Sequence, residues 1–490
     1  MLDSKVAEYG GEMLYINKSA GKPMWQMEYS RDEGLRKYWD EYSPPYHKEG
    51  AGPLYKGADA SSYNHNQDAH AIENIARWYD YWQERPGTGD RVNGGGVNIV
   101  FSESNTHYRG EENYRRSGEV DALRIQKDGY YAHKVMWDGW VNNEKPGIHI
   151  LGHWNYAAGV VKDMYVVSSA AKVELFVNGK SMGMGEQRNH FLFTFKNIVW
   201  QPGIIKAIGY DANGKKLTTA MHETAGSPYA LRLTQISAVN SFTANGADLA
   251  LFEIEVVDVQ GRRCPTALNM IHFTLNGAAT WRGGMAQGPD NFILSDTLPV
   301  ECGVNRILIR ATDQPGVITL TANATGLKTA RIQISSKPFK QVNGLSLQMP
   351  SDGLKPLLDK GPTPAAPSFT AIRTTLKVKA TKAGANSDKA VASYDDNEAS
   401  DWVNDGQLAT AWVEYELENV SAVSEVALKL NNFRTRTYPV KISVDGQVVF
   451  KDTTTHNLGY FTARFAPAKG CIIKIELYAT GEIKEVMAQK

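Results

Sequence analysis

The hydrophobic periodicity of the chain changes near Ile148, and this change limits the folds that the sequence can adopt. Before it, residues 69–85 place apolar side chains three and four positions apart, which predicts an amphipathic helix. A glycine-rich stretch then leads into the β-branched run 97–101, a predicted buried strand, and a second helix is expected around 129–140. After Ile148 the apolar residues alternate with period two, and the Asn-Gly turn at 178–179 predicts a hairpin. We therefore expect an α/β segment followed by all-β domains.

Further changes in composition divide the chain into five parts. Residues 1–146 carry the α/β pattern, and residues 147–226 and 227–336 each have the length and turn spacing of an immunoglobulin-like β-sandwich. The proline-rich residues 337–368 predict a linker with little structure of its own. Residues 369–490 predict a last all-β domain.

The bulk composition excludes several classes of partner. The 490 residues carry 53 Lys and Arg against 53 Asp and Glu, so the formal net charge is zero. Without a basic patch or a polybasic tail, binding to nucleic acid or to an anionic membrane is not expected. No apolar stretch approaches the roughly 20 residues of a membrane-spanning helix. Residues 1–9 contain Asp3 and Glu8 and lack an apolar centre, so they do not predict a signal peptide.

The spacing of cysteine and histidine predicts no metal site. Cys264, Cys302 and Cys471 form no CxxC pair, and the histidines lack the spacing of metal ligands. Cys264 and Cys302 are expected to be buried free thiols, and a disulfide between them is the alternative. The sequence therefore predicts no required metal ion or cofactor.

Residues 21–30, Gly-Lys-Pro-Met-Trp-Gln-Met-Glu-Tyr-Ser, place a carboxylate at the end of a short apolar strand. Enzymes with parallel α/β folds present reactive groups at this position, where a strand ends and a loop begins. The segment resembles the strand that carries the nucleophilic glutamate in glycoside hydrolase family 2, the group of β-galactosidases and β-glucuronidases. The resemblance implies that Glu28 is a nucleophile whose carboxylate is oriented by Tyr29. Residues 1–146 would then be the C-terminal part of a (β/α)8 TIM barrel.

Retaining hydrolysis of a glycosidic bond needs a second carboxyl group as acid/base, about 5–5.5 Å from the nucleophile. The family places it in an Asn-Glu pair before the nucleophile, whereas Asn143-Glu144 and Asn397-Glu398 both follow Glu28. The acid/base is therefore expected outside this chain, which should be the C-terminal portion of a larger enzyme and inactive alone. Glu103, at the end of the next strand, is the rival nucleophile.

The resemblance also implies residues that contact the sugar. Glu103, Asn105 and His107 follow the second strand, where related enzymes carry substrate-binding side chains; structural roles in the loop are the alternative. Trp137 and Trp140 lie at the end of the second helix, where the family has an aromatic floor for the sugar. Packing against the following sandwich is the alternative for both tryptophans.

The β domains resemble accessory modules of the same enzymes. Residues 168–183 and 199–210 resemble the sandwich that follows the barrel in many Bacteroidetes family 2 enzymes, and residues 248–258 resemble the next module. Residues 392–406 and 410–412 resemble the galactose-binding-like β jelly roll, also known as the discoidin type. In that fold, loop aromatics stack on sugar, which here implies Trp402, Phe433 and Tyr438.

The acidic loop of this last domain offers oxygen ligands for a structural calcium ion. The available carboxylates are Asp395, Asp396 and Asp401, and ordinary turn chemistry is the alternative.

These expectations together describe a retaining, exo-acting, β-galactosidase-like glycosidase of family 2. It would act on an oligosaccharide or polysaccharide, and the full-length enzyme would be periplasmic or extracellular by family resemblance. A non-catalytic carbohydrate-binding or assembly protein built from the same modules is the alternative. The sequence fixes neither the sugar nor the oligomeric state.

Overall fold

The computed structural model describes residues 10–13, 24–28, 33–49, 64–79, 93–96, 101–103, 116–141, 146–287, 290–342, 345–346, 376–395, 400–431, 436–455 and 461–479. The chain divides into two compact units. One contains residues 1–31, 73–99 and 370–490, and the other contains residues 32–72 and 100–369. Within the described residues the fold is mainly β, as predicted, with few helices.

Three short strands in the first unit form a parallel sheet. They are β1 (Gly10–Met13), β2 (Met24–Glu28) and β5 (Asn93–Gly96), in the order β1-β2-β5. Both pairings are parallel, which requires a crossover connection between β2 and β5. The strand expected to end at Glu28 is confirmed, while the strand expected at 97–101 lies mostly outside the described residues. Closure of the sheet into a barrel stays a prediction.

Both predicted helices are present. Helix α1 spans Gln67–Tyr79 and helix α2 spans Asp128–Val141. Each buries apolar side chains three or four positions apart, which lie on the same face of a helix. They include Ala71, Ile75 and Trp78 in α1, and Ala132, Val135 and Met136 in α2. Neither helix, among the residues that the structure describes, has the length and apolar character needed to cross a membrane.

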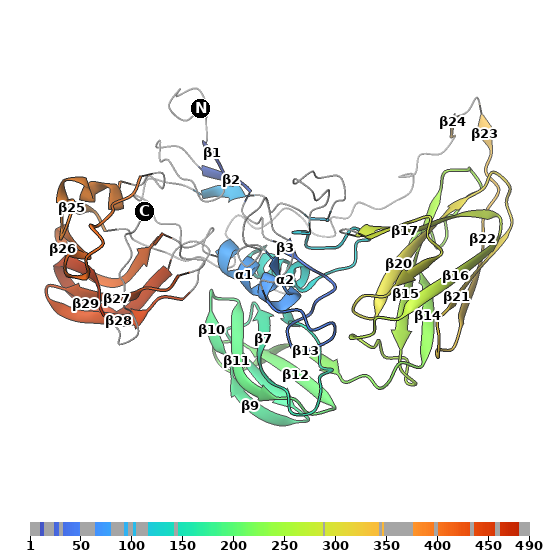
Figure 1. Ribbon diagram of the computed structural model, residues 1–490, viewed down its shortest axis with the longest axis horizontal. Helices are drawn as coiled ribbons and strands as arrows, with labels where there is room; N and C mark the ends of the chain where they lie inside the picture. Colours follow the sequence, from blue (N-terminus) through green and yellow to red (C-terminus); the bar gives the residue numbers. More distant parts are fainter. Residues whose placement is uncertain are drawn as a thin grey trace. The chain divides into compact units, whose positions relative to one another are not determined.

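Two four-stranded sheets form the first sandwich, which Figure 1 shows in green. One sheet has the order β10-β11-β7-β6 and consists of β6 (Ile148–Ile150), β7 (Val161–Ser168), β10 (Glu186–Arg188) and β11 (Leu192–Val199). The other has the order β13-β12-β8-β9 and consists of β8 (Lys172–Val177), β9 (Lys180–Met184), β12 (Ile204–Tyr210) and β13 (Lys216–Glu223). Buried and less buried residues alternate along β8 and β12, so one face of this sheet forms the core.

Helix α2 approaches this sandwich closely at Gly139. A Cβ atom at this position would lie 2.7 Å from Cε1 of Phe191 and 2.8 Å from Cβ of Ser169. The substitution Gly139→Val should therefore lower the free energy of unfolding by about 2–3 kcal/mol, because the added methyl groups have no space. Thermal unfolding followed by circular dichroism measures the change. Lys134→Val, at an exposed position of the same helix, is the control and should cost about 0.5 kcal/mol.

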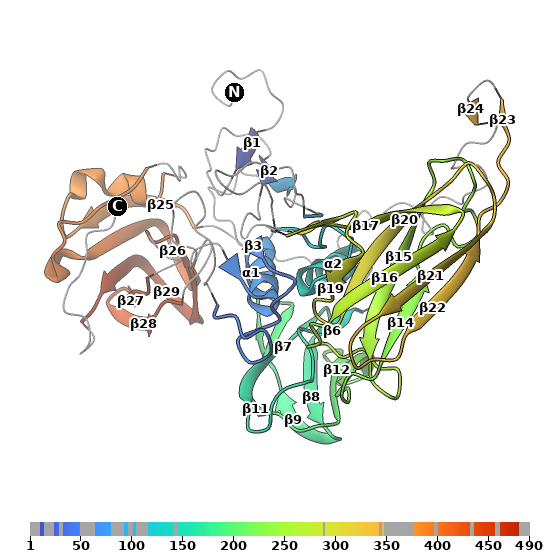
Figure 2. The same ribbon diagram turned by 45° about the vertical axis from the view of Figure 1, so that its right-hand side comes forward.

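The second sandwich contains nine strands in two sheets, which are drawn in yellow-green and yellow in Figure 2. One sheet has the order β14-β15-β20-β17-β18 and consists of β14 (Ala230–Gln235), β15 (Leu249–Val257), β17 (Ala279–Gln287), β18 (Asp290–Ile293) and β20 (Val304–Ala311). The other has the order β19-β16-β21-β22 and consists of β16 (Met270–Gly277), β19 (Thr297–Pro299), β21 (Val317–Asn323) and β22 (Ala330–Ser335).

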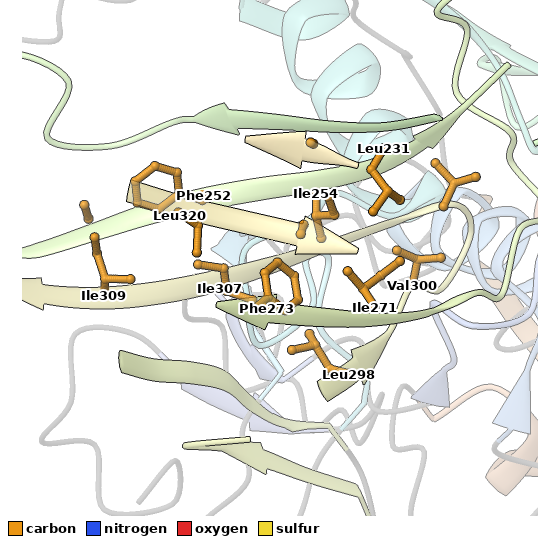
Figure 3. Packing of buried hydrophobic residues seen from close by; sticks show 14 of the residues in the cluster. Leu231, Phe252, Ile254, Ile271, Phe273, Leu298, Val300, Ile307, Ile309 and Leu320 are labelled. Atoms are coloured by element: carbon orange, nitrogen blue, oxygen red, sulfur yellow. The ribbon is translucent and has the colours of Figure 1, made fainter. Parts of the chain in front are cut away.

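The core of the second sandwich lies between its two sheets. Figure 3 shows aliphatic and aromatic side chains from both sheets gathered in one cluster, among them Phe252, Ile254, Ile271, Phe273, Ile307, Ile309 and Leu320. Each of these seven side chains is at most 5% exposed. Burial of this apolar surface on two facing sheets is the main contribution to the stability of a β-sandwich.

The two cysteines of this region are free thiols, as expected, so no disulfide joins Cys264 to Cys302. The Cys302 thiol donates to the carbonyl oxygen of Arg36 at 2.9 Å. Burial raises the pKa of Cys302 to about 12 and that of Cys264 to about 11. Both are therefore protonated and unreactive near neutral pH.

The C-terminal domain contains a five-stranded antiparallel sheet in the order β25-β26-β29-β27-β28. Its strands are β25 (Val378–Ala383), β26 (Trp412–Leu428), β27 (Pro439–Val444), β28 (Gln447–Thr453) and β29 (Phe461–Leu477). The jelly roll expected here stays a prediction. Part of the predicted linker forms a small antiparallel ribbon of β23 (Gln341–Val342) and β24 (Leu345–Ser346).

Candidate active site

Glu28 is the last residue of β2, the central strand of the three-stranded parallel sheet. Its backbone lies opposite Met13 of β1, and β5 pairs with the other edge of β2. In parallel α/β enzymes the carboxyl ends of the strands form the catalytic face. The Glu28 backbone therefore has the position expected of a catalytic residue, while its side chain and the whole of Tyr29 lie outside the described residues.

Glu103, the rival nucleophile, forms an ion pair with Lys127. The Lys127 ammonium lies 2.9 Å from the Glu103 carboxylate, and the side chains are 1% and 9% exposed. The same ammonium donates to the carbonyl oxygens of Gly34 at 2.6 Å and Arg116 at 3.0 Å. Lys127 therefore connects three segments that are distant in sequence, and these contacts favour the structural role of Glu103 over a catalytic one.

The neighbouring residue Asp128 connects α2 to the first sandwich. Its Oδ2 accepts a hydrogen bond from the backbone amide of Gly152 at 2.7 Å, and its Oδ1 lies 3.3 Å from Nε2 of His149. The His149 ring also stacks on Tyr131 of α2, with ring centroids 4.2 Å apart. Lys127 therefore contacts the segments around Gly34, Glu103 and Arg116, while the adjacent Asp128 contacts the first sandwich.

A second buried ion pair connects the loop after β3 (Glu33–Gly34) to the second sandwich. Nε of Arg36 lies 2.7 Å from Oδ2 of Asp121, and a terminal nitrogen donates to the carbonyl oxygen of Glu301 at 2.6 Å. Asp121 also accepts from the backbone amides of Leu123 and Ile125, both at 2.8 Å. The guanidinium also lies 3.2 Å from a carboxylate oxygen of Glu301, so Arg36 joins distant segments, and the cluster has a structural role rather than a reactive one.

Asp40 is the centre of another buried network. Its Oδ2 accepts from the hydroxyl of Tyr156 at 2.7 Å and contacts the Lys162 ammonium. Its Oδ1 accepts from the Ser43 hydroxyl and the Tyr42 amide, both at 2.9 Å. Although burial opposes ionisation, the Lys162 charge and these hydrogen bonds hold the pKa of Asp40 below its ordinary value.

His153, Ser43 and Asp40 have the composition of a Ser-His-Asp triad, but the direction of their hydrogen bonds excludes that chemistry. Nδ1 of His153 accepts from the Asn155 amide at 2.9 Å, so Nε2 carries the proton and donates to Ser43 Oγ at 3.1 Å. Ser43 in turn donates to Asp40. Burial lowers the pKa of His153 to about 3. A histidine that donates to the serine cannot remove its proton, so the network is structural.

The remaining predicted sugar-contact residues are only partly described. Asn105, His107 and Phe433 lie outside the described residues, and so does the side chain of Trp140. Trp137 is 52% exposed on α2, so its ring is available for contact.

Two predicted aromatics of the C-terminal domain are held by hydrogen bonds. Nε1 of Trp402 donates to the carbonyl oxygen of Ala385 at 3.1 Å. Tyr438 is 8% exposed, and its hydroxyl donates to the carbonyl oxygen of Asn431 at 2.5 Å. The burial of Tyr438 in the domain core leaves little of its ring for stacking on a sugar.

The predicted calcium loop is described in part. Asp395 accepts from the Ser400 hydroxyl at 2.7 Å, which is turn chemistry, and Asp401 is exposed. Asp396 lies outside the described residues. No cluster of three or more His, Cys, Asp or Glu suited to a metal ion occurs in the part of the chain that the structure describes. The calcium hypothesis stays untested.

Comparison with known proteins gives matches along most of the chain. Residues 234–333 match the family model described as glycoside hydrolase family 2 C-terminal domain 5, and residues 159–218 match a domain of unknown function, DUF4982. A β-glucuronidase of Formosa agariphila is 38% identical over 336 residues, which cover 67% of this chain and 32% of that protein. A β-galactosidase of Bacteroides ovatus is 32% identical over 228 residues, covering 45% of this chain and 25% of that protein.

A solved structure of a β-glucuronidase from glycoside hydrolase family 2 superposes with a TM-score of 0.64 at 26% identity. The superposition covers 96% of this chain and 52% of that chain. The β-sandwich fold and the sequence matches together identify these domains as modules of a glycosidase. They are the modules of the C-terminal portion of glycoside hydrolase family 2, which confirms the resemblance found in the sequence. The chain spans about a third or less of the curated relatives that it matches, 32% and 25% of their lengths.

Proposed function

We propose that this chain is part of a retaining glycoside hydrolase that cleaves β-linked glycosides, with Glu28 as its nucleophile. The observation that carries the proposal is the position of Glu28 at the carboxyl end of the central parallel strand. The matches of the modules after it to glycoside hydrolase family 2 support the same function.

In the proposed mechanism, a carboxylic acid protonates the leaving oxygen while Glu28 attacks the anomeric carbon. The bond to the leaving group breaks, and a covalent glycosyl-enzyme forms. Water then attacks the same carbon, the former acid takes its proton, and Glu28 is released as a carboxylate. Tyr29 would orient Glu28 by a hydrogen bond. The proposal assigns the acid/base role to neither Glu144 nor Glu398, because the family order places that residue before the nucleophile.

We propose a β-galactoside or a β-glucuronide within an oligosaccharide or polysaccharide as the substrate. The two curated relatives described above carry these two names, and the β-glucuronidase has the higher identity. The sugars differ in the configuration at C4 and in the group on C5, where a galactoside has a neutral hydroxymethyl group and a glucuronide has a carboxylate. Recognition of the carboxylate requires a cation or several hydrogen-bond donors in that subsite.

Covalent trapping tests the nucleophile and the sugar together. The protein is incubated with 2-deoxy-2-fluoro-β-galactosyl fluoride or its glucuronyl counterpart, alone and joined to the N-terminal portion of a close relative. Fluoride leaves without an acid, so the nucleophile can react even where the acid/base is absent. Peptide mass spectrometry should find the label on Glu28, and the probe that reacts identifies the sugar.

Two results would contradict the proposal. A label on Glu103 would show that the nucleophile lies on the following strand. No label from either probe, even in the joined protein, would favour the non-catalytic carbohydrate-binding alternative.

A further inference from the structure

Lys162 lies between two carboxylates that come from different segments. Its ammonium contacts Oδ2 of Asp40, in the loop after β3, and lies 3.8 Å from Oδ2 of Asp68, at the start of α1. Lys162 itself belongs to β7 of the first sandwich. The three side chains, which we call the Asp40–Lys162–Asp68 triad, are 3%, 6% and 16% exposed. One ammonium therefore faces two carboxyl groups with little access to water.

The two carboxyl groups are stabilised unequally. Asp40 accepts three hydrogen bonds from Ser43, Tyr42 and Tyr156 besides its contact with the ammonium. Asp68 accepts from the Ala69 amide at 2.7 Å, and the ammonium lies beyond hydrogen-bond distance of it. A buried charge needs such partners, so the proton of the triad should reside on Asp68. Burial raises the pKa of Asp68 to about 7, against the attraction of Lys162.

Other titratable groups surround the triad. They are Tyr42 of the loop after β3, Asp128 of α2, His153 and Tyr156 before β7, and Tyr165 of β7. Burial lowers the pKa of His153 and raises the pKa values of Tyr156 and Tyr165. His153 therefore stays neutral, and the tyrosines stay protonated. The repulsion of Asp40 and Asp128 adds to the cost of ionising Asp68.

We propose that the triad is a proton-dependent latch that attaches the start of α1 to the first sandwich. The closed latch holds one proton on Asp68, and loss of that proton leaves two carboxylates for one ammonium and favours opening. The inference concerns the assembly of the molecule and does not rest on the proposed glycosidase activity.

The direction of the pH dependence follows from proton linkage. Asp68 has an ordinary pKa of 3.8 when exposed to water and about 7 when buried in the closed latch. Between these values the closed state binds more protons than the open state, so a rise in pH favours opening by at most about tenfold per pH unit. The closed latch is fully stable below the lower value, and the effect levels off above the higher one.

Hydrogen–deuterium exchange of the whole protein tests the latch. Peptides that contain residues 36–43 and 161–168 are compared between the wild type and Asp68→Asn at each pH from about 5 to 8.5, a range that covers the upper part of the predicted transition and the plateau above it. The comparison at equal pH cancels the intrinsic pH dependence of exchange. The exchange rate of the wild type relative to the variant should rise about 10- to 100-fold across this range and then level off.

Three further variants define the outcome. Asp313→Asn changes an exposed aspartate of the second sandwich and should follow the wild type. Asp68→Ser keeps an acceptor for the Ala69 amide and should reproduce Asp68→Asn if the latter folds poorly. A wild-type-to-variant ratio that does not change with pH would overturn the proposal. If Asp40→Asn removes the pH dependence and Asp68→Asn does not, the proton resides on Asp40, which would also overturn the proposal.

Discussion

Replacement of Glu28 by Gln should lower the turnover of aryl β-glycosides by the full-length enzyme by about 10⁴-fold or more. Glutamine has the shape of glutamate but cannot attack the anomeric carbon, so the covalent intermediate does not form. Turnover of aryl β-galactosides and aryl β-glucuronides, followed by phenol release, measures the loss. Circular dichroism should show an unchanged fold, because Glu28 ends a strand whose backbone pairing does not involve its side chain.

Chemical rescue separates a lost nucleophile from a damaged site. In Glu28→Ala, azide should attack the anomeric carbon from the vacated side, displace the aryl oxide and give an α-glycosyl azide. A β-glycosyl azide would instead identify Glu28 as the acid/base. Glu103→Gln is the matched control and should keep turnover within about tenfold while lowering stability, because it weakens the Lys127 ion pair. If Glu103→Gln abolishes turnover and Glu28→Gln keeps it within about tenfold, Glu103 is the nucleophile.

The sequence predicted those helices and strands that depend on the pattern of neighbouring residues. The helix around residues 69–85 was predicted from the apolar spacing of Ile72, Ile75, Ala76, Tyr79 and Trp82. Helix α1 is present there and buries Ile75 and Tyr79, while Ile72 and Ala76 are partly buried. The alternating residues of Lys172–Val177 predicted a half-buried strand, and β8 buries every second side chain. In each case the side chains that determine the structure are close together in sequence.

The buried ion pairs of Arg36 and Lys127 could not be predicted, because they depend on contacts between distant segments. Lys127 donates to a carbonyl oxygen 93 positions earlier, and Arg36 donates to one 265 positions later. Lysine side chains are usually exposed, and the residues next to Lys127 in the sequence do not indicate that it is buried. Tyr438 illustrates the same limit: it precedes β27 and was interpreted as a loop aromatic, whereas tertiary packing buries it.

The nucleophile role of Glu28 was predicted from a sequence motif rather than from hydrophobic spacing. Its segment combines a Lys-Pro start, a short apolar run and a Glu-Tyr end, which together are specific enough to indicate the family. The structure adds the parallel pairing of β2 on both edges, which a single strand cannot reveal. Motif and pairing are independent observations, and both support the prediction that Glu28 lies on the catalytic face.

Replacement of Lys127 by Met should lower the free energy of unfolding of its unit by about 3–5 kcal/mol. Methionine fills a similar volume but donates no hydrogen bond, so the Glu103 carboxylate and two carbonyl oxygens lose the ammonium as a donor. Leaving a charge buried without its partner costs more than the intact pair contributes. Urea unfolding followed by tryptophan fluorescence measures the shift in midpoint, read separately for each transition because the chain has several domains.

Two comparison variants show whether the buried charge of Glu103 causes the loss of stability in Lys127→Met. Lys134→Met removes an ion pair with Asp138 in which the lysine is 54% exposed, and should cost at most about 0.5 kcal/mol. The double variant Lys127→Met with Glu103→Gln should recover part of the stability, since it also removes the buried charge that Lys127 neutralises. If Lys127→Met costs no more than Lys134→Met, Lys127 does not hold the three segments together. If the double variant is less stable than the single one, the loss comes from the carbonyl contacts rather than from Glu103.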